Sequence, residues 1–262
     1  MKNLFAIVIL VITGHACTSS PTGRSQLILF SDSQMASMGA ASFQQMKQQN
    51  PPRADAATAA YVQCLSNALL LAAGEQPQQW EVQVFEHESP NAFALPGRKI
   101  GVHTGMIELA ATPAQLAAVI GHEIGHVQAR HGAERVSLAF ASQAGQQLAA
   151  ITLQDNENAP LLMAAIGVGS QLGVLLPYSR SHESEADQIG LQLMARAGFD
   201  PADAVALWRN MAAAGGSGMP EFLSTHPSSA SRIEQLGRLQ AAAEPLYQQA
   251  LAAGRRPDCR KP

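Results

Sequence analysis

The 262-residue sequence contains little charge, few aromatic residues and only three cysteines. Charged residues make up 14% of the chain, against about a quarter in an ordinary soluble domain. The formal net charge is −3, so there is no basic excess, which excludes a nucleic-acid binder. Three cysteines exclude a disulfide-rich scaffold, and an apolar fraction of 47% excludes disorder as the main state.

Alanine, with 46 residues, supplies much of the apolar fraction and favours helix. Apolar side chains recur at helical spacing through most of the chain, while the segment WEVQVF alternates in the manner of a strand. Helices are predicted over residues 31–49, 54–73, from Pro113 onward after a Thr112 cap, and over 136–152, 160–175, 181–197, 201–213 and 228–252; extended segments are predicted over 80–85, 92–95 and 99–103. The predicted fold class is therefore α+β, mostly helical with one small sheet.

A nine-residue apolar run, Leu4–Ile12, lies near the start of the chain. It fits the core of a signal peptide and is too short to span a bilayer. The sequence Gly-His-Ala-Cys that ends at Cys17 resembles a bacterial lipoprotein box, although Gly14 stands where an aliphatic residue is common. We therefore expect Cys17 to be lipidated and the protein to face the periplasm from the outer membrane. A soluble periplasmic protein is the alternative, and the intact mass of the mature chain distinguishes the two.

These features predict the organisation of the chain. The predicted parts are a signal peptide (1–16), a lipidated cysteine with a flexible tether (17–25), a main domain (26–254) and a C-terminal tail (255–262). After export, Cys64 and Cys259 would be the two remaining thiols. Because that compartment is oxidising, a disulfide between them is our hypothesis.

Residues 159–176 form an almost uncharged apolar stretch. A transmembrane span is one interpretation, but the three glycines, the serine and the glutamine within it favour a buried or hairpin helix. A lid that touches a membrane is a third alternative. The sequence does not decide whether residues 137–177 form such a lid.

The residues that carry chemistry gather in one predicted helix, which contains His122-Glu123-Ile124-Gly125-His126. This H-E-x-x-H spacing puts His122 and His126 one helical turn apart, so both imidazoles can bind one metal ion. Glu123 lies beside them, where its carboxylate can take a proton from a water that zinc has acidified. Apolar neighbours place the motif in an interior, where polar side chains need partners.

A metal held by two histidines needs a further protein ligand. His131 is a poor candidate, because it lies nine residues after His122 and about half a turn around the helix. Glu183 and Asp187 are helical neighbours at i and i+4. Glu183 can ligate the metal while Asp187 accepts a hydrogen bond from a ligand imidazole. Spacing alone leaves a solvated acidic patch as the alternative.

Several motifs stand in a fixed order: NAFALPG, HEIGHVQARHG, then ESEAD 61 residues after His122, MARAGFDP and STHPSSASRI. In this order they resemble the HtpX-like zinc metallopeptidases, which include the CAAX prenyl proteases, and especially the bacterial periplasmic lipoprotein branch (LoiP- and BepA-like). The resemblance implies a zincin-like domain with a small antiparallel sheet beside the HEXXH helix. It implies His122, His126 and Glu183 as zinc ligands, Glu123 as catalytic base and an orienting role for Asp187.

Two further sites follow from the resemblance alone. Asn91, Ala92 and Phe93 would lie on an edge strand beside the metal, where an extended substrate adds as a further strand. An ordinary edge strand is the alternative. His226 would approach the zinc and hold the enzyme inactive, or would assist the transition state, and Arg232 of the same segment would contact substrate. A loop histidine without such a role is the alternative.

The sequence therefore predicts a metalloendopeptidase with one Zn²⁺ per chain that hydrolyses misfolded or damaged cell-envelope proteins. Some relatives dock through a C-terminal repeat domain, but only 36 residues follow His226, so none is expected here. One alternative is a zinc-stabilised chaperone or outer-membrane assembly scaffold without catalysis, against which the presence of Glu123 argues. The other is a membrane-anchored interaction module, against which the metal motif argues.

Overall fold

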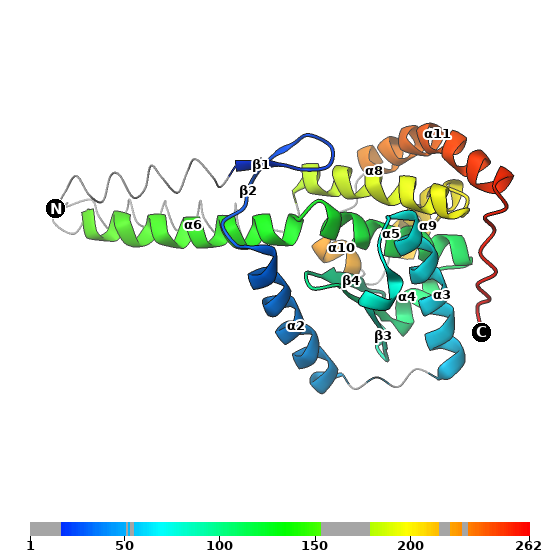
Figure 1. Ribbon diagram of the computed structural model, residues 1–262, viewed down its shortest axis with the longest axis horizontal. Helices are drawn as coiled ribbons and strands as arrows, with labels where there is room; N and C mark the ends of the chain where they lie inside the picture. Colours follow the sequence, from blue (N-terminus) through cyan, green and yellow to red (C-terminus); the bar gives the residue numbers. More distant parts are fainter. Residues whose placement is uncertain (1–16, 51, 53–54, 153–178, 215–220, 227–229) are drawn as a thin grey trace. The chain divides into compact units, whose positions relative to one another are not determined.

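The computed structural model describes residues 17–50, 52, 55–152, 179–214, 221–226 and 230–262 (Figure 1). The predicted signal peptide (1–16) and the predicted helix over 160–175 lie outside the described residues. Where the sequence suggested one domain over 26–254, the chain divides into two compact units. The smaller comprises residues 1–31 and 130–177, and the larger comprises residues 32–129 and 178–262.

The described residues of the smaller unit form a β-hairpin and a long helix. Strands β1 (Cys17–Ser19) and β2 (Ser25–Leu27) pair antiparallel, and helix α6 spans His131–Thr152. The guanidinium of Arg24 donates to both oxygens of Glu134 in α6, at 2.8 and 2.6 Å. The backbone N–H of Leu29 donates to Ser137 Oγ at 2.9 Å. These contacts correct the flexible tether expected over 17–25: the segment is a hairpin because its backbone and charged groups find partners within the unit.

The larger unit is mostly helical, as predicted (Figure 1). Its elements are α2 (Asp32–Gln49), α3 (Ala56–Ala72), η1 (Pro77–Gln79), β3 (Glu81–Phe85), β4 (Ala92–Leu95), β5 (Lys99–His103), α4 (Thr104–Leu109), α5 (Pro113–Gln128), α8 (Arg180–Ala197), α9 (Ala202–Ala214), α10 (Glu221–Thr225) and α11 (Ala230–Ala252). Local signals set several boundaries. The Thr112 side chain caps α5, whose first residue is Pro113, and Gly198 ends α8 with φ = 92°.

The sheet of the larger unit has the order β3-β5-β4. β4 and β5 form an antiparallel hairpin around Gly97, whose φ of 85° suits glycine. β3 pairs with β5 in parallel, so the sheet is mixed rather than wholly antiparallel. The reason is topological. The hairpin reverses the chain, so β5 runs antiparallel to β4, and β5 then lies in the centre of the sheet, where it runs parallel to β3. β4 is thereby left at an edge. The predicted α+β, helix-dominated class is confirmed.

Helix α5 lies in the core of this unit and packs against α3, α8, α9 and β4. All of its residues from Gln115 to His126 are buried. The core around it is aliphatic, with fully buried side chains from α3, β5, α5 and α8: Leu65, Leu69, Ile100, Ile120, Ile124 and Met194. This helix carries two histidines and a glutamate, and buried polar side chains need polar partners from neighbouring elements. Those partners form the site described below.

The two cysteines that the sequence analysis paired are disulfide-bonded, with Cα atoms 5.7 Å apart. Cys259 is buried, and Lys261 Nζ donates to the carbonyl oxygen of Ala110 at 2.9 Å. The C-terminal segment is thus attached to α3 and to the end of α4. Among the described residues, no helix is both long and apolar enough to cross a membrane.

Candidate metal centre

The HEXXH residues lie on α5, where His122, Glu123 and His126 are each at most 3% exposed. His122 and His126 are one turn apart, and their Nε2 atoms approach to 3.0 Å. Glu123 turns toward strand β4, whose Ala94 N–H donates to Glu123 Oε2 at 3.2 Å. The spacing in the sequence therefore translates into two convergent imidazoles with a carboxylate beside them.

Helix α8 brings Glu183 and Asp187 to the same point, and both are 3% exposed. The solvated acidic patch is thereby excluded, and both carboxylates face the histidines of α5. Small residues make this approach possible. A Cβ added at Gly125 would lie 2.9 Å from the Ala186 carbonyl oxygen, and one at Gly190 would lie 2.8 Å from the backbone nitrogen of His122. The crossing of α5 and α8 therefore depends on glycine.

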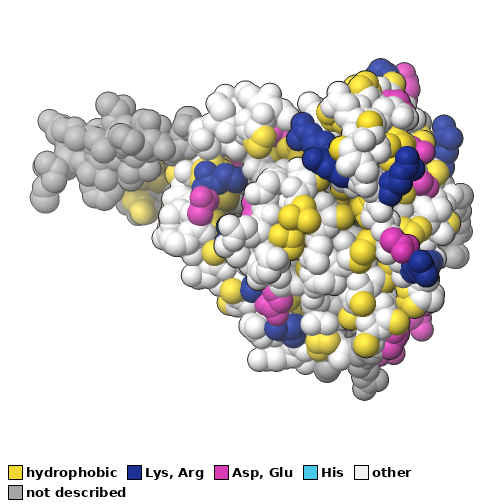
Figure 2. Space-filling model, turned by 45° about the vertical axis from the view of Figure 1, so that its right-hand side comes forward, with side chains coloured by type: hydrophobic (Ala, Val, Ile, Leu, Met, Phe, Trp, Pro, Cys, Tyr) yellow, Lys and Arg dark blue, Asp and Glu magenta, His cyan; other side chains and the backbone are white. Residues whose placement is uncertain are grey.

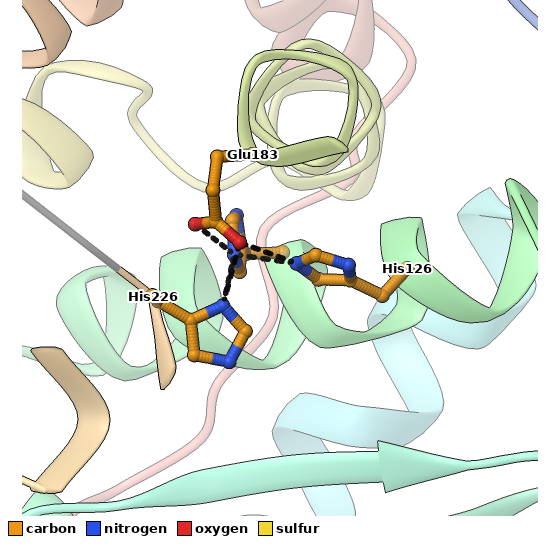
Figure 3. A group of neighbouring side chains, drawn as sticks. His126, Glu183 and His226 are labelled. Carbon is orange, nitrogen blue, oxygen red and sulfur yellow. Dashed lines mark hydrogen bonds and ion pairs between the residues drawn. The ribbon is translucent and has the colours of Figure 1, made fainter. Parts of the chain in front are cut away.

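Four side chains present one ligand atom each, all within 4.8 Å of one another: His122, His126, Glu183 and His226 (Figure 3). The distances are 3.2 Å from His122 Nε2 to His226 Nδ1, 3.3 Å from His126 Nε2 to Glu183 Oε1, and 3.0 Å from His226 Nδ1 to Glu183 Oε1. A tetrahedral zinc ion with bonds of about 2.0–2.1 Å places its ligands about 3.3 Å apart. The buried donor set thus fits a four-coordinate cation in spacing and in chemistry.

The electrostatics of the site favour a positive charge between the side chains. Burial lowers the pKa of His122, but hydrogen bonds and negative charge from Asp187 and Glu183 outweigh it and raise the pKa to about 9. Asp187 Oδ1 lies 2.9 Å from His122 Nδ1, which leaves Nε2 pointing at the other donors. Burial holds the pKa of His126 well below its usual value, so this imidazole is neutral, as a metal ligand must be.

The two glutamates of the site have opposite pKa shifts. Burial raises the pKa of Glu183, but hydrogen bonds from His122, His126 and His226 outweigh it and the pKa falls, so Glu183 stays ionised as a ligand requires. Burial raises the pKa of Glu123 above its ordinary value. A carboxylate with a raised pKa is a stronger base near neutral pH, as proton abstraction requires.

Residues 56–240 match the model of a protein family described as "Peptidase family M48". The chain belongs to peptidase family M48. Among its relatives, mitochondrial metalloendopeptidase OMA1 of Schizosaccharomyces pombe is 38% identical over 181 residues, which cover 68% of this chain and 52% of the relative.

Two other relatives are named Beta-barrel assembly-enhancing protease. The protein of Yersinia pestis is 31% identical over 215 residues (77% of this chain, 43% of the relative). That of Escherichia coli is 28% identical over 253 residues (88% and 51%). The chain therefore spans about half the length, or less, of the curated relatives it matches.

Of the three residues assigned to an edge strand, Ala92 and Phe93 lie in β4 (Ala92–Leu95), at the edge of the sheet, and Asn91 precedes the strand. Phe93 packs on Phe43 and Phe85, with ring centroids 6.3 and 5.8 Å apart, on the side of the sheet away from α5. Because strand side chains alternate, Ala92 and Ala94 face α5. The Asn91 carbonyl oxygen accepts from His103 N of β5 at 2.9 Å. The structure thus directs the backbone N–H of Ala94, rather than the Phe93 side chain, to Glu123.

Arg232 has a different place from the substrate contact that the resemblance implied. It is 6% exposed, and its Nε and Nη2 donate to the two oxygens of Asp187 at 2.8 Å each. Its Nη1 lies 2.5 Å from Glu183 Oε2. The charge of Arg232 outweighs burial and lowers the pKa of Asp187. The guanidinium therefore binds both Glu183, which belongs to the donor set, and Asp187, which orients His122.

Two aromatic residues that the sequence did not single out lie beside the metal centre of this M48 chain. The Phe222 ring of α10 stacks on His226, with centroids 4.4 Å apart and planes 17° apart. Trp208 of α9 lies over the Arg232 guanidinium, 3.8 Å from Cζ to the ring centroid. Apolar periodicity marks both as core residues. Trp208 lies 18 residues before His226 and Phe222 lies four residues before it, and no local pattern connects either aromatic residue with metal binding.

Proposed function

We propose that this M48 chain is a zinc-dependent metalloendopeptidase. The observation that carries the proposal is the position of Glu123, a buried carboxylate beside the donor set but outside it. Histidine nitrogens with one carboxylate oxygen are donors typical of catalytic zinc. When bound, zinc polarises a carbonyl group and lowers the pKa of water, and this is the chemistry that peptide hydrolysis needs.

The residues of the chain would supply the base, the support of the metal ligands and the binding of the peptide. Glu123 takes a proton from the attacking water and can return it to the leaving amine. Asp187 holds the His122 imidazole through Nδ1, and Arg232 holds Asp187. The open edge of β4 offers backbone groups with which an extended peptide can pair beside Glu123.

We infer that the substrates are unfolded or misassembled proteins of the cell envelope. Recognition through an edge strand reads backbone and therefore suits polypeptides that have lost their fold. On the face seen in Figure 2, charged side chains of both signs are scattered among hydrophobic ones, which agrees with recognition that does not depend on charge. The two relatives named for β-barrel assembly support an envelope location. Lipidation of Cys17 and attachment to the outer membrane are parts of this proposal.

Removal of the metal tests the proposed activity. The purified chain loaded with Zn²⁺ is expected to cleave casein, an unfolded protein, at internal peptide bonds. After treatment with 1,10-phenanthroline and dialysis, cleavage should fall by at least about 100-fold, because the Lewis acid has been removed. Re-addition of Zn²⁺ in slight excess should restore it. Cleavage that persists at full rate in the metal-free protein would contradict a metallopeptidase.

His226 provides a second test, because its Nδ1 completes a set of four protein donors and its Nε2 lies 3.5 Å from Glu123 Oε1. A catalytic zinc site keeps one position open, whereas four protein ligands close it. We therefore propose that His226 closes the site and that His226→Ala raises basal casein cleavage by about tenfold, if about nine molecules in ten are closed. The thermal midpoint should stay near that of the parent.

The same variant distinguishes the enzyme from a zinc-stabilised scaffold, for which four protein ligands would also be suitable. In a scaffold, loss of His226 would weaken zinc binding and produce no casein cleavage. A cleavage rate that is unchanged in His226→Ala would remove His226 from both the inhibitory and the catalytic role.

A further inference from the structure

The indole of Trp208 occupies a central position among the groups that hold the metal donors. It is 4% exposed and comes from α9, whereas the three side chains whose distances follow come from α11, α10 and α5. Its ring lies 3.8 Å from Arg232 Cζ, 5.8 Å from the Phe222 centroid and 6.2 Å from the His122 centroid, in the last case edge-on at 74°. One side chain thus contacts the guanidinium, a ligand imidazole and the ring that stacks on His226.

The Arg232 guanidinium must keep one orientation, because it binds two carboxylates of α8 at once. Its hydrogen bonds to Asp187 and its ion pair with Glu183 lie at its nitrogen atoms, which point outward in the plane of the group. The faces of a guanidinium cannot hydrogen-bond but are attracted to an aromatic ring, most strongly to an indole. An indole over one face therefore restrains rotation of the group without competing for its donors.

We infer that Trp208 is a positioning residue for the metal centre: it holds Arg232 in the orientation that binds Glu183 and Asp187 together. Glu183 then presents its oxygen to the donor set, and Asp187 keeps His122 Nε2 directed at the same point. The inference rests on the proposed zinc site. It goes beyond that site, because Trp208 acts through Arg232 and touches neither the metal nor a substrate.

The experiment measures zinc affinity of the full chain by competition with a chromophoric chelator, and the visible absorption spectrum of the Co²⁺-substituted protein. Removing residues that hold metal ligands typically weakens binding by about 10–100-fold. Because Trp208 acts through Arg232, we expect Trp208→Leu to weaken zinc binding by about tenfold, at the lower end of that range, and to alter the Co²⁺ spectrum. Trp208→Phe, which keeps a smaller and weaker aromatic face over the guanidinium, should weaken zinc binding measurably but less than Trp208→Leu does.

Trp80→Leu is the matched control, since it removes another buried indole of the same unit, 7% exposed, whose N–H donates to Glu75. This change should lower the thermal midpoint and leave zinc affinity and the Co²⁺ spectrum unchanged. If Trp80→Leu weakens zinc binding as much as Trp208→Leu does, general destabilisation explains both and the inference is wrong. Parental zinc affinity in Trp208→Leu would also overturn it.

A double-mutant cycle decides the matter even if Trp208→Leu fails to fold. We expect Trp208→Phe to lower zinc affinity clearly less in an Arg232→Lys background, because the compact ammonium has no planar face for the ring to orient. Additive effects of the two changes would overturn the inference. If the parent chain binds no zinc, the proposed zinc site fails; if it binds zinc and the cycle is additive, only the role of Trp208 fails.

Discussion

Glu123→Gln is expected to abolish casein cleavage while the chain still binds one Zn²⁺. The amide has the size of the carboxylate but cannot take a proton, and general-base catalysis contributes about 10²–10⁴-fold to rate. Zinc should be retained because Glu123 lies outside the donor set of His122, His126, Glu183 and His226. The rate of casein cleavage and the zinc content per chain, measured on the same preparation, check both halves of the prediction.

The matched control is Glu108→Gln, the same chemical change at an exposed residue of α4. It should keep the parental cleavage rate and zinc content. Cleavage by Glu123→Gln at the rate of the control would refute Glu123 as the base. Loss of zinc from Glu123→Gln would instead mean that this carboxylate holds the metal, and the assignment of ligands would need revision.

Gly190→Ala is expected to weaken zinc binding by about 10–100-fold, although the residue provides no ligand atom. The new Cβ would lie 2.8 Å from the backbone nitrogen of His122 and 2.9 Å from its Cα. Neither atom can yield as a flexible side chain does, so α5 and α8 must separate and carry His122 away from Glu183. Overpacking of this kind costs about 1–3 kcal/mol, which outweighs the gain of about 1 kcal/mol from replacing helical glycine by alanine.

Gly237→Ala makes the same substitution in α11, where an added Cβ would meet nothing within 4 Å. It should raise the free energy of unfolding by about 0.4–1 kcal/mol and leave zinc affinity unchanged. Chelator competition and thermal unfolding of the metal-free proteins measure the two effects separately. If Gly190→Ala binds zinc as tightly as Gly237→Ala does, the helix crossing has more tolerance than the contact distances imply.

Much of the helical structure was predictable because its signals are local. The Thr112 cap and Pro113 mark the start of α5, and the Gly198 terminator marks the end of α8. The boundaries of β4 and β5 agree with the predicted segments because the turn at Gly97, which separates them, is a local signal. The pairing of β3 with β5 was not predictable in this way. It depends on which edge of the sheet the hairpin takes, and no local signal carries that information.

The two histidines and Glu123 of the site were also predictable, since an i, i+4 spacing fixes which side chains share a helical face. Glu183 and Asp187 remained open on spacing alone, because an acidic pair on a helix face is equally compatible with solvent. Burial against α5 decides between the two: a carboxylate at 3% exposure must be paired, and here histidines and Arg232 pair it.

The sequence by itself therefore determined most of the long helices, the HEXXH face with its base, and the pair of cysteines that the structure joins. The tertiary structure alone decided which distant residues complete the centre. It brought His226 to the fourth donor position, turned Arg232 from a substrate contact into a support for Glu183 and Asp187, and placed Trp208 over that guanidinium. The physical reason is range: a helical repeat constrains neighbours within one or two turns, whereas these contacts arise only where close-packed helices cross.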